Sequence, residues 1–499
     1  MSPTSVPATP LAEVPFQSHP RGLRTLFFTE MWERFSYYGM RALLVLFMMD
    51  AVRGGMGMDE KTANAIYGIY TGAVYLLALP GGWLADRLWG AQRAVWYGGI
   101  VIAIGHFTLA IPRAEAFFLG LMFVALGSGI LKPNMSTLVG DLYPEGGTRR
   151  DSGFTIFYMG VNLGAFIGPL VCSALGEKVN WHYGFAAAGV GMVLGLIQFR
   201  LTRHHLGSAG IERGSNAPLH LLEKVGLFGG VGGAVVVIAL TMTRVISFDA
   251  VAIARGLTAV ILGIAAVYFA SLFLFSGLTR VERQRVGLIL VLFLASALFW
   301  AGFEQGGSSL NIFAERFTER QWTWLFRFEI PAGWFQSLGA VFIIMFAPVF
   351  ASFWIHLGRR NLDPSIPAKF GLGLLLLAVG FLVMVGASAV IVSGNRASPN
   401  WLILTYLFHT FGELCLSPVG LSSVTKLAPR RLVGQMMGTW FLATALGNVL
   451  AGLLAGEFKV DAPGEWSGLY LNIVIAPAAG GLLLILFAKP IKRLMAGAK

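Results

Sequence analysis

Apolar runs long enough to cross a lipid bilayer recur along the whole chain, and short polar segments separate them. A membrane-spanning helix needs about 20 mostly apolar residues, whereas a strand is far shorter. The pattern therefore predicts fourteen spanning helices, an even number that leaves both chain ends on one side. We place them at approximately 23–49, 62–85, 93–111, 115–140, 152–174, 183–203, 221–243, 252–276, 286–311, 331–357, 369–393, 401–427, 432–456 and 467–488.

The first of these runs is interrupted by polar side chains at a regular spacing. They fall at i, i+3, i+4, i+7, i+8 and i+11, so a helix places all of them on one face. The residues are Glu30, Glu33, Arg34, Tyr37, Tyr38 and Arg41. The pattern fits either a soluble amphipathic helix or a membrane helix with an ionisable face.

Composition favours the membrane. Hydrophobic residues make up 56% of the 499 positions and charged residues 12%, about half of the roughly 25% usual in soluble domains. The mean hydropathy is +0.70. The 63 glycines suit helices that pack closely in lipid. We predict an all-α polytopic membrane protein.

The basic residues indicate orientation and do not indicate nucleic-acid binding. The net charge is +12, yet Lys and Arg lie in short clusters between the apolar runs, without a single patch. Alternate connections hold 23 basic residues on one side and 11 on the other. Because cytoplasmic loops carry the excess, both termini are predicted to be cytoplasmic in a multi-pass plasma (inner) membrane protein. Cys172 and Cys415 stand alone in apolar runs, so we expect packing roles, with no metal site.

Seven charged residues lie well inside the predicted spans, away from the connections: the bases Arg34, Arg41 and Lys132 and the acids Glu30, Glu33, Glu304 and Glu413. Each charge at the bilayer centre costs about 2.5–3.5 kcal/mol, so these side chains must face one another or a water-filled interior. With four acids and three bases, one carboxylate lacks a partner. That excess predicts a protonatable acid without identifying it.

The chain divides into two halves. We predict a disordered tail (1–20), an N-terminal six-helix bundle (21–206), a linker with two extra transmembrane helices (207–279) and a C-terminal six-helix bundle (280–499). The central stretches of the two extra helices carry no ionisable residue, so we expect no share in a site. Asp86 and Arg87, in the turn GWLADRLWGAQR, resemble the loop 2–3 motif of the major facilitator superfamily and are predicted to form a cytoplasmic gate.

Five motifs carry a closer resemblance. They are EMWERFSYYG, GILKPN around Lys132, FYMGVNLGAFIGP around Tyr158, FWAGFEQGGSS around Glu304 and GELCLSPVG around Glu413. Together they resemble the proton-dependent oligopeptide transporters (POT/PTR family), in the same order and over nearly the whole chain. The resemblance implies the major facilitator fold and a proton-coupled symporter of di- and tripeptides. The proton would be the coupling ion with no other cofactor, and no obligatory protein partner is expected beside the peptide and the bilayer.

The resemblance also implies roles for single residues. Arg41 and Lys132 would bind the peptide carboxylate, and Glu413 would bind its ammonium group with Asn162 nearby. Other substrate-binding candidates are Arg34, Tyr37, Tyr38, Tyr75, Tyr158, Trp300, Ser417 and Trp440. Glu304 is the first candidate for proton coupling, and the group Glu30, Glu33 and Arg34 is the second.

Structural alternatives stay open for several of these residues. Tyr75 and Trp440 are also explained by helix packing, Tyr158 and Asn162 by hydrogen bonds between helices, and Lys132 and Glu304 by static ion pairs. Ser417 could satisfy backbone groups freed by Pro418.

Alternatives also stay open for the function. Another anionic or zwitterionic cargo, such as nitrate, is the alternative within transport. An intramembrane enzyme is not expected, because the sequence lacks HExxH and nucleophile pairs such as Ser/Lys.

The sequence departs from the family pattern at two places. Mammalian members carry a histidine in a segment AIYHTF, where this chain has AIYGIY with Gly68, so coupling is expected to rest on carboxylates. Members commonly carry Asn in a SLNP-like setting, where this chain has Gly339 and Ala340. The amino-terminal clamp is therefore predicted to lose an amide group, for which Gln336 is only a partial substitute.

Overall fold

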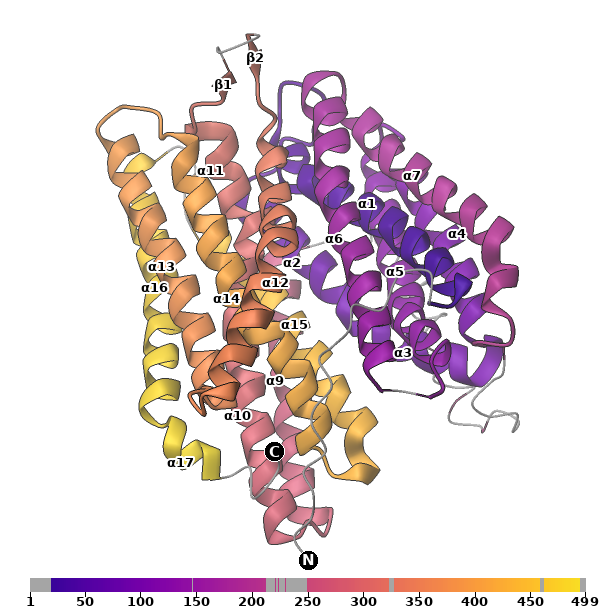
Figure 1. Cartoon of the computed structure of the whole chain (residues 1–499). Helices are drawn as coiled ribbons and strands as arrows, with labels where there is room; N and C mark the ends of the chain where they lie inside the picture. The colour runs from indigo at the N-terminus through magenta and orange to yellow at the C-terminus, as the bar shows by residue number, and fades with distance from the viewer. Residues whose placement is uncertain are drawn as a thin grey trace, which may run out of the picture.

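The structure is a computed structural model that describes residues 19–145, 147–211, 220, 223, 229, 249–322, 327–457 and 462–493. Within these ranges nearly every ordered segment is helical (Figure 1). Eleven helical spans have the length and hydropathy of a membrane crossing. The prediction of an all-α polytopic membrane protein is confirmed.

The first half of the chain forms one bundle, drawn in indigo to magenta (Figure 1). Its helices are α1 (Arg21–Met49), α2 (Glu60–Leu76), α3 (Ala78–Leu84), a π-helical turn (Ala85–Trp89), α4 (Ala91–Leu109), α5 (Ala114–Asp141), α6 (Gly147–Lys178), α7 (Trp181–Thr202) and a 3-10 turn (Arg203–Leu206). The long helix α1 packs against α6 and α7. Its polar face is therefore enclosed, as the cost of charge in lipid requires.

The second half forms the other bundle, in pink to yellow (Figure 1). Its elements are α10 (Arg280–Phe303), a 3-10 turn (Glu304–Gly307), α11 (Ser309–Phe317), β1 (Gln321–Trp322), β2 (Phe328–Glu329), a 3-10 turn (Ala332–Gln336), α12 (Ser337–Arg359), α13 (Ile366–Val392), α14 (Pro399–Leu427), a 3-10 turn (Arg430–Leu432), α15 (Val433–Ala455), α16 (Pro463–Leu486) and α17 (Ala488–Arg493). The strands form an antiparallel hairpin. We call the end of the molecule that carries it the hairpin end.

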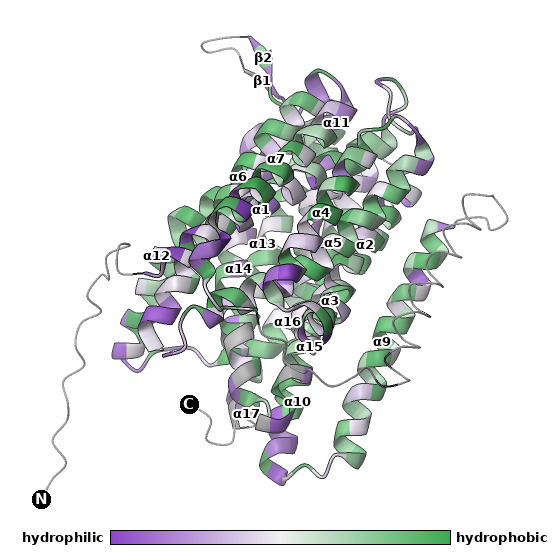
Figure 2. Cartoon of the chain, turned by 90° about the vertical axis from the view of Figure 1, so that its right-hand side faces the viewer, coloured by the Kyte–Doolittle hydropathy of each residue, from purple (hydrophilic) through white to green (hydrophobic). Residues whose placement is uncertain are grey.

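Of the two extra helices predicted between the bundles, α9 (Ala250–Phe275) is described, and the one at 221–243 lies outside the described residues apart from Glu223 and Gly229. Helix α9 packs on α2 and α15 and otherwise shows an apolar surface (Figure 2). Val260, Ile264 and Val267 are exposed on it, which suits contact with lipid tails.

The remaining predicted helices are all present, and their bounds differ from the prediction by a few residues. Two of them are broken. The helix predicted at 62–85 is interrupted at Leu77, and the one predicted at 286–311 changes to a 3-10 turn at Glu304. The hairpin β1–β2 is also new to the structure, since no strand was predicted.

Contacts between the bundles gather at the hairpin end. There the Glu177 carboxylate, at the end of α6, accepts hydrogen bonds from the backbone N–H groups of Ala332 (2.7 Å) and Gly333 (2.9 Å). Next to it, Lys178 forms an ion pair with Glu329 at 2.7 Å. We call these five residues the α6–α12 clasp. The clasp joins the end of α6 in the N-terminal bundle to β2 and the 3-10 turn that precede α12 in the C-terminal bundle.

Two more hydrogen bonds extend this junction along α6 and α12. The indole of Trp334 donates to the carbonyl of Leu170 (2.9 Å), and the Ser337 hydroxyl donates to the carbonyl of Phe166 (2.8 Å). The bundles are therefore closed against each other at the hairpin end.

Candidate substrate and proton-coupling site

Helix α1 holds three charges in one buried group. The Arg34 Nε atom lies 2.7 Å from Glu30 Oε1 and 3.0 Å from Glu33 Oε2. All three side chains are buried. Since the i, i+4 spacing brings Glu30 under Arg34 on one face, the arrangement follows from the helix itself. The three residues predicted as a second coupling group thus lie in contact, and together they carry one negative charge in excess when all are ionised.

A second buried ion pair joins the two bundles. Arg41 of α1 lies 3.2 Å from Oε2 of Glu304, which begins the 3-10 turn after α10. The hydroxyl of Tyr67, on α2, donates to the same oxygen at 3.5 Å. That hydroxyl also packs directly on the Cα of Gly307, so no larger residue fits there. The broken helix thus presents Glu304 to two residues of the opposite bundle.

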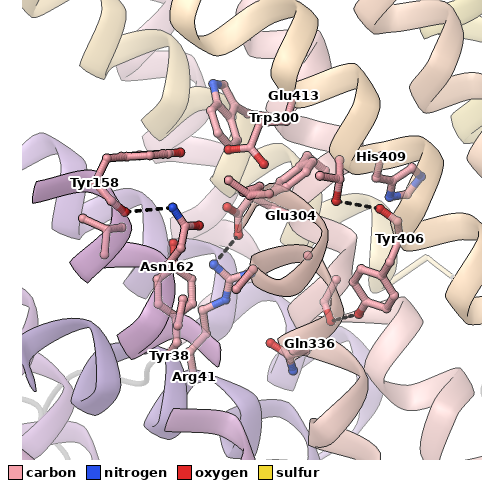
Figure 3. Close-up of a pocket in the computed structure, with 18 of the residues that line it drawn as sticks. Tyr38, Arg41, Tyr158, Asn162, Trp300, Glu304, Gln336, Tyr406, His409 and Glu413 are labelled. Carbon is pink, nitrogen blue, oxygen red and sulfur yellow. Dashed lines mark hydrogen bonds and ion pairs between the residues drawn. The ribbon is translucent and has the colours of Figure 1, made fainter. Parts of the chain in front are cut away.

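Between the bundles lies a cavity of about 850 Å³ that is partly open to solvent (Figure 3). Helices α1, α2 and α6 form one wall, and α10, α12 and α14 form the other. Eight of the predicted site residues line it: Tyr38, Arg41, Tyr75, Tyr158, Asn162, Trp300, Glu304 and Glu413. In Figure 3, Glu413 lies toward one end and Arg41 toward the other, with Glu304 between them.

The structure identifies the acid that lacks a partner. Arg34 and Arg41 already form the ion pairs described above. Glu413, by contrast, forms no ion pair with any described residue. Within the same residues, Lys132 also lacks a carboxylate partner. Its buried Nζ has no hydrogen bond and lies over the rings of Tyr37 (4.0 Å) and Tyr75 (5.1 Å). Among the described residues, Glu413 is therefore an unpaired anionic group on the cavity lining, and Lys132 is an unpaired cationic group behind the wall, against the ring of Tyr75.

Five predicted substrate contacts do not line the cavity: Arg34, Tyr37, Lys132, Ser417 and Trp440. Arg34 is enclosed by its two glutamates, and Tyr37 lies behind the wall, between Lys132 and Tyr70. The hydroxyl of Ser417 is buried one turn beyond Glu413 and has no hydrogen-bond partner among the described residues. The structure therefore does not bring these predicted contacts to the cavity lining.

Trp440 is the clearest correction. Its indole packs on Gly420 of α14, where a Cβ would collide with it, and on Phe370, 6.4 Å away between ring centroids. Both neighbours belong to the C-terminal bundle. Packing, which was the alternative explanation for this residue, accounts for its position.

The structure also adds residues that the sequence did not single out. Tyr67 reaches Glu304, and Tyr406 lines the cavity while donating to the carbonyl of Gly306 at 3.2 Å. Thr410 lies one turn after Tyr406 on α14 and shares its face. The only signal available for Thr410 was its i, i+3 spacing to Glu413, which places both on one side of a helix.

The predicted gate residues lie in the π-helical turn. Arg87 pairs with Glu223 of the linker through two bonds, Nε to Oε1 at 3.0 Å and Nη2 to Oε2 at 2.6 Å. Asp86 is exposed. Gly90 ends the turn with φ +76°, a conformation that favours glycine.

Two helical bundles that close over a charged cavity define a membrane carrier. Comparison with known proteins identifies the family. A sequence model of the POT family matches residues 92–463. The chain belongs to the POT family, as its motifs predicted.

Curated relatives match over nearly their whole length. A peptide transporter of Yersinia enterocolitica, YePEPT, is 44% identical, with 96% of each chain covered. A di-/tripeptide transporter of Lactococcus lactis subsp. cremoris is 36% identical, with 97% of this chain and 98% of the relative covered.

Solved structures show the same architecture. The crystal structure of a peptide transporter POT in complex with sulfate matches with a TM-score of 0.89 at 43% identity, covering 97% of this chain and 98% of that one. A POT family transporter in complex with a thioalcohol-conjugated peptide matches with a TM-score of 0.86 at 36% identity, covering 95% and 98%. The predicted fold of two helical bundles is confirmed, and of the two extra helices between them the structure describes α9.

Proposed function

We infer that this protein is a proton-coupled symporter that imports di- and tripeptides by alternating access. The observation that carries the inference is the partly open cavity between the bundles: Glu413 lines it without an ion-pair partner among the described residues, and the unpaired Lys132 lies behind its wall, against the ring of Tyr75. Buried charges without partners are costly, so such groups are retained where a ligand completes them. A peptide zwitterion supplies an ammonium and a carboxylate. Two or three extended residues span about 7–11 Å.

The names of the relatives support the same cargo, since the Lactococcus protein is a di-/tripeptide transporter. In our proposal Glu413 binds the peptide ammonium group, with Asn162 beside it on the cavity wall. Arg41 and Lys132 bind the carboxylate. Tyr38, Tyr75, Tyr158 and Trp300 form the wall between the poles, which suits variable side chains because aromatic rings offer apolar area with a polar tip.

Proton coupling is assigned first to Glu304. Its carboxylate pairs with Arg41 across the bundles, so a proton on Glu304 would break that pair. The freed guanidinium could then take the peptide carboxylate, which links proton binding to peptide binding. The cluster of Glu30, Glu33 and Arg34 on α1 is the second coupling group, and coupled carboxylates of this kind titrate together.

Orientation completes the proposal. The excess of Lys and Arg places both termini in the cytoplasm of an inner-membrane protein, so the hairpin end faces outward. The α6–α12 clasp then closes the outer side. Import requires this clasp to open, because the bundles rock around the central site.

Breaking the clasp is expected to favour the outward-open state. Glu177→Gln leaves one acceptor oxygen for the two N–H groups of Ala332 and Gly333. Hydrogen bonds to a charged group are worth about 1.5–3 kcal/mol, so the closed state should lose a similar amount. Spin labels on cysteines introduced at the exposed positions Val52 and Asn395 should show a larger share of long distances.

Lys178→Gln is the matched control for this variant. It breaks only the half-exposed ion pair with Glu329, worth about 0–1 kcal/mol, so the distance distribution should barely change. An unchanged distribution in Glu177→Gln would contradict a closing role for the clasp.

Uptake into proteoliposomes tests the function itself. With an inward proton gradient, labelled dialanine should accumulate, and a proton ionophore should abolish the accumulation. Nitrate should neither accumulate nor compete, because it has no cationic group for Glu413. Properly folded protein that accumulates no dipeptide under a gradient would refute the proposal.

A further inference from the structure

The cavity wall on the side of the C-terminal bundle has a gap in it. Helix α12 turns Gln336, Gly339, Ala340 and Ile343 toward the cavity, at i, i+3, i+4 and i+7. Helix α14 packs beside it and presents Tyr406, Thr410 and Glu413. At the level of Gly339 and Ala340 the wall consists of backbone and one methyl group. A recess therefore opens between α12 and α14.

Gly339 has no structural reason to be glycine. A Cβ placed on it would meet a single atom within 4 Å, Oγ1 of Thr410 at 4.0 Å. Its φ lies outside the positive range that only glycine adopts easily. By contrast, a Cβ on the helical Gly302 would lie 2.7 Å from Leu377, so close packing explains that glycine. Glycine inside a helix costs about 1 kcal/mol relative to alanine, and no neighbouring helix uses the space at Gly339.

The space is bordered by polar groups that a ligand can use. Nε2 of Gln336 is buried and has no hydrogen-bond partner. The Thr410 hydroxyl donates to the carbonyl of Tyr406 at 2.8 Å, which leaves its own oxygen as an acceptor. Glu413 follows Thr410 by three residues and lies on the same helix face. The recess thus adjoins the anionic pole of the cavity.

We propose that Gly339 determines specificity: the recess that it leaves takes the side chain of the peptide's amino-terminal residue. The inference rests on the proposed function and on an ammonium group bound at Glu413. That group is attached to the α-carbon of the first residue, so the first side chain starts beside Thr410 and Gly339. First side chains larger than a methyl group are therefore expected to enter this space, and those with a hydrogen-bond acceptor to meet the free amide of Gln336.

Two variants and two isomeric dipeptides test the proposal. Gly339→Val fills the recess, and Ala165→Val narrows the cavity from α6, on the opposite wall. Competition against labelled dialanine uptake gives the half-inhibitory concentrations of Phe-Ala and Ala-Phe for each protein. A methylene in a pocket is worth about tenfold or more in discrimination, so Gly339→Val should raise the Phe-Ala value by roughly tenfold or more. Ala-Phe should change little, and Ala165→Val should not reproduce this selectivity.

Equal changes for both isomers, or a Phe-Ala value that stays at the wild-type level, would overturn the proposal. Gly339→Ala provides a second variant with a smaller change and a higher helix propensity. It should shift the ratio in the same direction if Gly339→Val does not fold. Failure of the proposed function is recognised separately, because wild-type protein would then show no dialanine uptake for either isomer to inhibit. The role proposed for Gly339 would then also be refuted.

Discussion

Glu304→Gln is expected to abolish gradient-driven peptide accumulation while peptide exchange across the membrane continues. Glutamine has the shape of a protonated glutamate and cannot release a proton. Arg41 then loses its ion-pair partner, as it would after protonation of the wild-type protein. The cavity can still bind peptide, but the transport cycle no longer carries a proton across the membrane.

Two measurements on the same proteoliposomes separate these effects. Dialanine uptake under an inward proton gradient should fall to the level seen without a gradient, and counterflow of labelled against unlabelled dialanine should stay measurable. Glu145→Gln is the control, since Glu145 forms a half-exposed ion pair with Arg149 at 3.1 Å and does not line the cavity. Driven uptake that persists in Glu304→Gln would move the coupling role to the cluster on α1.

The helices could be predicted from the sequence because lipid imposes a simple rule on the backbone. Every apolar run of about 20 residues must be helical to satisfy its own hydrogen bonds, and the observed bounds follow the runs closely. The break at Glu304 was not predicted. The motif FWAGFEQGG continues an apolar run, and its glycines allow a helix or a turn equally. The turn is packed against another part of the chain, the Tyr67 hydroxyl on Gly307, and the local sequence gives no sign of this contact.

The pairing of the charged residues could be predicted well, whereas the positions of the aromatic side chains relative to the cavity could be predicted less well. The buried charges of Arg34 and Arg41 require acidic partners, and few acids are present inside the membrane. An aromatic ring carries no such constraint, so nothing in the sequence separated Trp300, which lines the cavity, from Trp440, which packs inside a bundle. Only three-dimensional contacts decide which face of a helix is inward.

The structure explains why position 68 carries glycine and no histidine. A Cβ there would lie 3.0 Å from the carbonyl oxygen of Asn448 and 3.0 Å from the Cα of Gly452. Helices α2 and α15 thus cross backbone to backbone at this point, which small residues make possible. A histidine does not fit without moving α15. The sequence suggested only that coupling rests on carboxylates, and the close crossing gives the physical reason why this position carries no titratable side chain.

Arg34→Leu is expected to destabilise the folded protein severely. Arg34 neutralises two buried carboxylates at 2.7 and 3.0 Å, and its removal leaves Glu30 and Glu33 side by side without a cation. Removing one partner from a buried ion group costs about 3–5 kcal/mol. Thermal unfolding in detergent should therefore begin at a clearly lower temperature than in the wild type. Lowering the pH lets protons neutralise the two carboxylates, so the deficit should shrink in acid.

A triple variant separates charge from packing in this cluster. Combining Glu30→Gln, Glu33→Gln and Arg34→Leu removes the whole charge group, and the replacement of a buried ion group by neutral side chains is often close to neutral for stability. The triple variant should therefore unfold near the wild-type temperature, at acidic and neutral pH alike. Glu304 and Arg41 are unchanged in the triple variant. If the cluster shares in proton coupling, gradient-driven peptide uptake should nevertheless fall. If Arg34→Leu and the triple variant lost the same stability at every pH, shape rather than charge would explain why α1 carries an arginine at this position.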